Sequence, residues 1–226
     1  MASITRITLA AALTLFAFNT SAFAQSKSTE NDASASKTET PAPPRVSDAE
    51  GASREKAAPG PTSVAERDRI LSDMYKRLSE ADNPDYAKLV STAIEKLWVF
   101  SGSDTVDLLM RRAQIAIGKK DPSAAKAILN AVVGLRPSYA EAWNRRAFVH
   151  FSSKDYQAAL SDLRRVLILD PKHFKAIGGL AVILREYGRD EAALAAFRRA
   201  LAINPQDEDV RKAVKELQIE VEGRAI

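Results

Sequence analysis

Apolar residues recur at helical spacing through the C-terminal half of the chain. From residue 140 to residue 152, and again from residue 156 to residue 169, they fall three or four positions apart, which predicts two amphipathic helices. A single pair of such helices cannot bury its apolar side, so neighbouring pairs must stack on it. The stripe of the second helix consists of Ala159, Leu160, Leu163, Val166 and Leu167.

Three prolines mark a fixed period in this pattern. Pro137, Pro171 and Pro205 stand 34 residues apart, and each closes a block of small and apolar residues. A constant period of this length is typical of a helical repeat array. The predicted repeats are residues 106–139, 140–173 and 174–207.

Several positions within these blocks carry a characteristic side chain. Trp143 occupies position 4 of its repeat, Gly188 position 15 and Tyr156 position 17, and alanine recurs at position 20. This pattern resembles the tetratricopeptide repeat, a helix-turn-helix unit. The resemblance implies an all-α solenoid of about three such repeats. The chain departs from the family at position 7, where Arg112 and Arg146 replace leucine.

A further helical pair is predicted before the repeats. Ser63 and Glu66 have the spacing of a capping box, and the apolar residues that follow predict a helix that Asn83-Pro84 ends. A second helix is expected from about residue 85 to residue 100. We interpret residues 63–105 as a degenerate N-terminal helical pair, either a weak repeat or a packing cap.

A capping helix and a tail are predicted after the repeats, in residues 208–226. Asp207 or Asp209 is placed to accept hydrogen bonds from its first free amides. Because the last unit of an array needs a polar outer face, we expect this helix to solvate the end of the array.

The first 24 residues have the features of a secretory signal peptide. Arg6 precedes an apolar run over residues 7–18, and Ala22-Phe23-Ala24 stands before Gln25. The alternative is an uncleaved anchor, but the run has 12 residues, whereas a bilayer span takes about 20. We expect a periplasmic or secreted protein with no membrane span after signal cleavage.

Residues 25–62 are rich in Pro, Ser and Ala and contain almost no large apolar residue. Such a segment cannot bury enough surface to offset its ordering entropy. It is predicted to be a disordered tether, or merely a spacer left by the export signal.

Composition argues against catalysis, cofactors and nucleic acid. The chain has no Cys and two His, and neither His150 nor His173 stands in a catalytic or metal-binding pattern. We therefore expect no enzyme activity, no cofactor and no metal. The net charge of +4 is spread along the chain, whereas nucleic-acid binding usually needs a dense basic stripe.

The resemblance also implies a binding groove on the first helix of each repeat. Apolar residues there would form a floor and basic residues a rim, which suits a protein or peptide segment with apolar anchors and acidic side chains. The implied groove residues are Met110, Arg111, Gln114, Asn144, Arg145, Phe148, Phe151, Lys175, Val182 and Arg185.

Other interpretations of these groove residues stay open. Asp107 precedes Arg111, and Glu141 precedes Arg145, by four residues, so each pair could neutralise itself along its helix. Phe148 and Phe151 could equally pack against the next repeat. Oligomeric state is left open by the sequence.

We interpret the chain as a periplasmic adaptor or scaffold that binds a protein segment in its groove, for an envelope complex. The alternative is an auxiliary or regulatory module of a cell-envelope enzyme whose catalytic part is on another chain. The stretches around Leu97-Trp98 and residues 171–174 are also similar to exported repeat proteins of alphaproteobacteria. That resemblance implies no defined activity.

Overall fold

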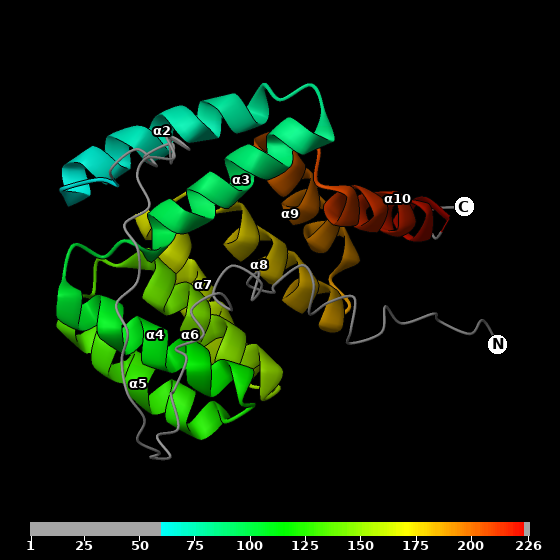
Figure 1. Cartoon of the computed structure of the whole chain (residues 1–226). Coiled ribbons are helices and arrows are strands. Elements are labelled where there is room, and N and C mark those ends of the chain that lie inside the picture. The colour runs from blue at the N-terminus through cyan, green and yellow to red at the C-terminus, as the bar shows by residue number, and fades with distance from the viewer. Residues whose placement is uncertain (1–59, 224–226) are drawn as a thin grey trace, which may run out of the picture. The chain divides into compact units, whose positions relative to one another are not determined.

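The computed structural model describes residues 60–223, and within that range every regular element is a helix. The predicted signal peptide lies outside the described residues, as does nearly all of the predicted tether. The helices are α2 (Val64–Ser79), α3 (Pro84–Val99), α4 (Asp104–Gly118), α5 (Pro122–Leu135), α6 (Ala140–Ser152), α7 (Tyr156–Leu169), α8 (Phe174–Glu186), α9 (Asp190–Ile203) and α10 (Glu208–Gly223) (Figure 1).

Three stacked helical pairs, α4–α5, α6–α7 and α8–α9, form the repeat array. Each pair falls within one of the predicted repeats apart from the first two residues of α4, and the all-α solenoid is confirmed. The alanines at position 20, Ala125, Ala159 and Ala193, are fully buried. A methyl group is the largest side chain that such a close helix approach admits.

The apolar stripes of the repeats meet in two clusters. Leu129 and Val132 of α5 pack with Ala142 and Val149 of α6 in the first cluster. Leu163 of α7 packs in the second cluster with side chains of α8, α9 and α10. Each repeat therefore buries its apolar side against the next one, as a stacked array requires.

Polar side chains cap the N-terminal ends of several helices. Ser63 Oγ accepts a hydrogen bond from the Glu66 amide at 3.2 Å, as predicted, and the Glu66 carboxylate accepts bonds from the amide and hydroxyl of Thr62. Asp207 Oδ1 accepts from the Val210 amide at 3.1 Å. Of the two aspartates predicted to cap α10, Asp207 makes this bond.

The turn inside each repeat contains one residue with a left-handed backbone. Lys120, Lys154 and Gly188 have φ values of 56°, 61° and 67° and stand 34 residues apart. Glycine adopts this conformation without the steric cost that a Cβ atom brings. Only the third repeat uses glycine at this position.

The N-terminal pair α2–α3 lies across the array and does not stack in line as a further repeat (Figure 1). α2 packs on α9, and α3 packs on α6. The Tyr139 hydroxyl donates to the Val99 carbonyl at 2.8 Å, and Gln206 Nε2 donates to the Ala81 carbonyl at 3.2 Å. Of the two alternatives, a degenerate repeat or a packing cap, these contacts favour the packing cap, because the pair packs on the loops that join successive repeats.

The last helix covers the end of the array, as predicted. Val210, Ala213 and Leu217 of α10 are buried and belong to the same cluster as α9. None of the described helices is both long and apolar enough to cross a membrane.

Substitutions at the left-handed turn position should change the free energy of unfolding through the backbone conformation and not through side-chain contacts. We expect Lys154→Gly to raise the free energy of unfolding by roughly 0.5–1 kcal/mol, because it relieves a left-handed lysine. Gly188→Lys is the matched control and should lower the free energy of unfolding by a similar amount. A Cβ at Gly188 would meet nothing within 4 Å, so the loss comes from the left-handed backbone alone. Urea unfolding of both variants measures this, and a less stable Lys154→Gly variant would contradict it.

Candidate functional site

A buried carboxylate contacts two residues of the predicted groove. Glu141, in the first turn of α6, is 3% exposed. Its Oε1 accepts a hydrogen bond from Arg145 Nε at 2.9 Å, and its Oε2 accepts from Asn144 Nδ2 at 3.1 Å. His173 Nε2 lies 3.5 Å from the same Oε2. A negative charge is also favoured at a helix N-terminus.

These neighbours keep Glu141 ionised. Burial alone would raise its pKa, but the charge of Arg145, the nearby His173 imidazole and the hydrogen bond from Arg145 prevail and lower the pKa to about 2. The carboxylate is therefore an anion that is held in place at any physiological pH.

Aromatic stacking joins this anion to the helical pair α2–α3. The ring of Trp98 stacks on the ring of His173 with centroids 3.8 Å apart and planes 7° apart. Trp98 Nε1 donates to the Tyr75 hydroxyl at 3.0 Å, which donates to Asp170 Oδ2 at 2.6 Å. His173 also caps α8, since its Nδ1 accepts from the Ala176 amide. Both histidines were expected to be structural, and the contacts of His173 serve packing.

The apolar residues of the predicted groove do not form an open floor. Met110, Phe151 and Val182 are buried in the two repeat clusters. Phe148 is half-buried and packs against the second cluster. The prediction of an open floor is therefore wrong for Met110, Phe151 and Val182, because the repeats use those side chains to pack on each other.

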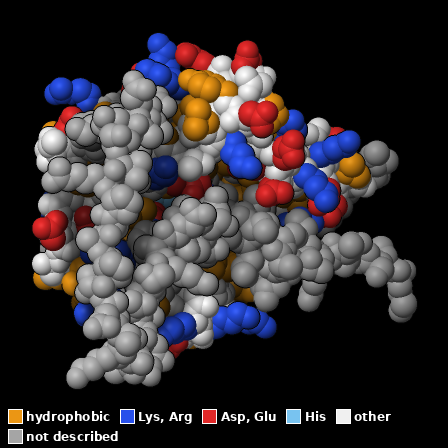
Figure 2. Space-filling view, in the orientation of Figure 1, with side chains coloured by type: hydrophobic (Ala, Val, Ile, Leu, Met, Phe, Trp, Pro, Cys, Tyr) orange, Lys and Arg blue, Asp and Glu red, His pale blue; other side chains and the backbone are white. Residues whose placement is uncertain are grey.

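The polar residues of the predicted groove are largely engaged in internal contacts. Asn144 and Arg145 hold Glu141, and Gln114 Oε1 accepts from Arg145 Nη1 at 3.1 Å. Lys175 Nζ pairs with Glu95 of α3 at 2.8 Å, and Arg185 pairs with Glu220 of α10 at 3.0 Å. Three of the four basic rim residues, Arg145, Lys175 and Arg185, are thus in ion pairs. On the face shown in Figure 2 both signs of charge intermingle over α10.

The two predicted pairs along α4 and α6 have different outcomes. Glu141 and Arg145 form the expected salt bridge. Asp107 instead accepts hydrogen bonds from the amide and hydroxyl of Ser101, and Arg111 is exposed. Sequence spacing alone did not reveal that a residue from the preceding loop would engage Asp107.

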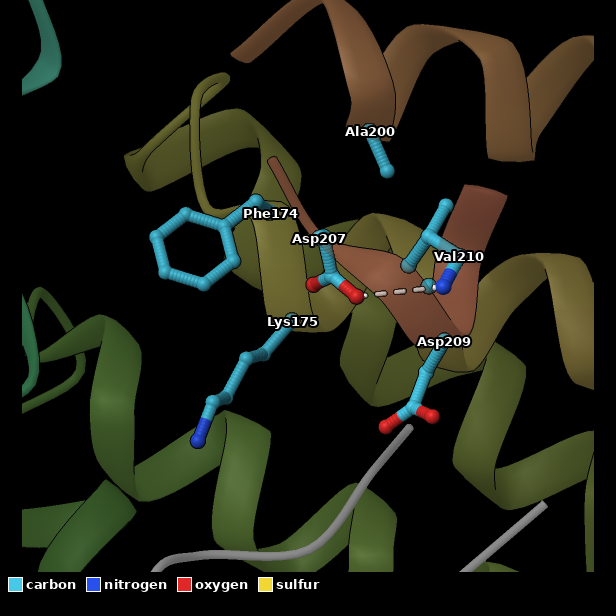
Figure 3. Close-up of a pocket in the computed structure, with 7 residues that line it drawn as sticks. Phe174, Lys175, Ala200, Asp207, Asp209 and Val210 are labelled. Atoms are coloured by element: carbon cyan, nitrogen blue, oxygen red, sulfur yellow. Dashed lines mark hydrogen bonds between the residues drawn. The ribbon is translucent and has the colours of Figure 1, made fainter. Parts of the chain in front are cut away.

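A small recess lies beside Lys175, where α8 meets the start of α10 (Figure 3). It has a volume of about 60 Å³, which is small for a metabolite pocket. Burial and the charge of Asp209 raise the pKa of Asp207, while the bond from the Val210 amide and Lys175 oppose the rise. The recess is lined by Phe174, Lys175, Gly178, Ala200, Asp207, Asp209 and Val210.

Of the residues that line the recess, Lys175 was predicted to lie in the groove, whereas Asp207 and Asp209 were predicted only to cap the last helix. Asp207 and Asp209 follow Pro205 closely in the sequence, where the next helix starts beside α8. This position could have indicated that both aspartates line the recess. No group of three or more metal-ligating side chains comes together among residues 60–223.

Comparison with protein families identifies the array. Two family models described as tetratricopeptide repeat match residues 110–173 and residues 150–217. The chain is a tetratricopeptide repeat protein. This fold is typically an interaction module without catalytic activity.

Individual relatives match this tetratricopeptide repeat protein in part. A TPR repeat-containing protein of Rhizobium etli is 39% identical over 75 residues, which cover 33% of this chain and 37% of that protein. The match thus spans little more than a third of the relative's length. Among solved structures, the Arabidopsis OM64 TPR domain is 24% identical with a TM-score of 0.49, covering 50% of this chain and 94% of that one. The MamA RS-1 ArsTM double mutant is 16% identical with a TM-score of 0.48, covering 69% and 85%.

Stability below neutral pH should report the Glu141 cluster. Because the folded pKa of Glu141 lies below its ordinary 4.5, its stabilisation is present above pH 4.5 and is lost as pH falls toward 2. Glu141→Gln should lower the free energy of unfolding at neutral pH by on the order of 3 kcal/mol and flatten the loss between pH 4.5 and 2.

A matched control is Glu220→Gln. Glu220 also pairs with an arginine, Arg185, but its side chain is more exposed than that of Glu141. We expect that variant to lose less than about 1 kcal/mol. Denaturant unfolding at several pH values compares the unchanged protein with both variants. Equal losses of unfolding free energy in the two variants would contradict the prediction that the Glu141 cluster stabilises the fold more than an exposed ion pair does.

Proposed function

We propose that this tetratricopeptide repeat protein is a periplasmic adaptor that binds a segment of another protein and holds it in an envelope complex. The repeats at residues 110–217 indicate a scaffold for protein–protein interaction. Periplasmic location is supported by the signal-peptide features of residues 1–24.

The observation that supports binding on the inner helices α6 and α8 is the pairing of a half-buried ring with a polar recess. Phe148 of α6 keeps part of its ring accessible, and Lys175 of α8 lines the recess beside α10. A ring and a charged recess on neighbouring helices suit a segment with an apolar anchor and a carboxylate. That carboxylate would share Lys175 with Glu95.

The rigid attachment of α2–α3 adds to this proposal. Its contacts with Asp170, His173 and Lys175 fix the start of α8 before any partner arrives. A preformed surface loses less conformational entropy on binding than a flexible one.

Export is tested by the mass of the protein recovered from the cell envelope. We expect the mature chain to begin at Gln25, because the small-residue pattern before it is a cleavage site. Intact-mass spectrometry of the periplasmic fraction measures this. A mass that retains residues 1–24 would contradict the prediction, and so would recovery from the cytoplasm.

Binding on the inner helices is tested with the protein captured by the mature chain from the same fraction. Phe148→Ala should weaken its binding by at least about 2 kcal/mol if the ring is a hot spot. Lys175→Glu should weaken binding more at low salt than at high salt, because an exposed charge contact is screened over about 10 Å at 0.1 M. Titration calorimetry at two salt concentrations gives both values.

Two controls separate binding from folding. Glu95→Lys combined with Lys175→Glu restores the internal ion pair with reversed sign, so a loss that persists in this double variant belongs to the partner contact. Ile168→Ala changes an exposed residue of α7 and should leave binding unchanged. If the swapped variant binds normally and Phe148→Ala is merely unstable, the inner helices are not the binding surface.

A further inference from the structure

The first helix of the array exposes two apolar residues that its sister helices bury. Leu108 and Ile115 of α4 are 43% and 58% exposed. They stand two turns apart, each about one turn from Arg111, and lie opposite the buried stripe of Val106, Met110 and Ala113.

The repeat period shows what normally covers these positions. The residues 34 positions later are Ala142 and Val149 of α6, and those 68 positions later are Ala176 and Ile183 of α8. All four are at most 3% exposed. Ala142 and Val149 are covered by side chains of α5, the second helix of the preceding repeat. The outer face of α4 therefore has the geometry of a surface on which one more helix packs.

The N-terminal pair does not supply that helix. α3 is engaged with α6, and its Trp98 is stacked on His173. Residues 25–62 have almost no large apolar side chain and so lack a stripe that would cover Leu108 and Ile115.

Charge indicates the chemistry of the missing helix. Arg111 and Arg112 lie between Leu108 and Ile115 on the same face, and both are exposed. Within residues 60–223 neither takes part in a salt bridge. Asp107, four residues before Arg111, accepts hydrogen bonds from Ser101 instead. An apolar stripe flanked by two cations is complementary to an amphipathic helix with acidic residues beside its own apolar stripe.

The same charges disfavour a second copy of this chain. Two α4 helices packed about a two-fold axis would place Arg111 and Arg112 against their own counterparts, which is repulsive. The outer face of α10 has Ile219 among exposed Glu208, Lys212, Lys215 and Glu222. Its two anions are balanced by two cations, so it complements Arg111 and Arg112 less well than an acidic helix does.

We propose that the outer face of α4, formed by Leu108, Arg111, Arg112 and Ile115, binds an acidic amphipathic helix of another protein. This surface is separate from the inner helices of the proposed function and continues the array at its open end.

Photocrosslinking tests this surface in the cell that makes the protein. The photoreactive residue p-benzoylphenylalanine replaces Leu108 or Ile115 in the full chain, and the crosslinked peptide is identified by mass spectrometry. The expected adduct joins α4 to an acidic, amphipathic helical segment of a different protein. Arg111→Glu with Arg112→Glu should lower the adduct yield at least about tenfold, because it places like charges across the contact.

The chain offers a matched control on α10. Ile219 is 66% exposed and is the only large apolar residue of α10 that is exposed, and Glu208 and Glu222 balance Lys212 and Lys215 around it. Because this face has neither an apolar stripe nor an excess of cations, the same probe at residue 219 should give no such adduct. Lys212→Glu with Lys215→Glu should leave the adduct at residue 108 unchanged. Should the glutamates on α4 lower the melting temperature, Arg111→Gln with Arg112→Gln gives the same test with a smaller expected loss.

Several outcomes would overturn the proposal. They are an adduct to a second copy of the chain, to residues 25–62 or to lipid, an adduct yield that ignores the charge variants, and the absence of any adduct at both positions.

Discussion

The arrangement of the whole described region depends on one buried anion. Removing the Glu141 carboxylate from water is costly, and its stability in the interior requires partners that are themselves fixed. Arg145 and Asn144 come from the next turn of the same helix, while His173 comes from the loop that follows the second repeat. Because His173 is held at this distance, its ring presents a flat face on which Trp98 stacks. The anion thereby links the interior of the array to the pair α2–α3.

Because α2–α3 packs across the loops of the array, the inner helices and the outer face of α4 have different surroundings. On the inner helices this packing brings Glu95 to Lys175, so the cation there is already paired when a partner arrives. At the open end of the array it leaves α4 without the covering helix that α6 and α8 have. The first surface is largely prearranged by internal ion pairs, and the second is an apolar face with exposed arginines. The two surfaces proposed for protein partners therefore differ in their chemistry.

Much of the fold could be predicted from sequence because its causes are local. The 34-residue period, the alanines at position 20 and the proline that closes each repeat depend on contacts within a repeat or between successive repeats. Those contacts recur, so the pattern repeats with them. The cap at Ser63 and the apolar stripe of α10 also follow from residues close in the chain. The candidate site was predicted less well, since Met110, Phe151 and Val182 were assigned to a groove and lie in the core.

Sequence by itself determined the helices, their pairing, their order and the identity of the repeat, because each rests on periodic spacing along the chain. Only the tertiary structure decided where α2–α3 docks, since the Trp98–His173 stack and the bond from Tyr75 to Asp170 join residues 75 and 95 positions apart. It also decided which basic residues are paired. Lys175 and Arg185 find Glu95 and Glu220 on distant helices, and no spacing rule connects groups whose meeting depends on how separate helices pack.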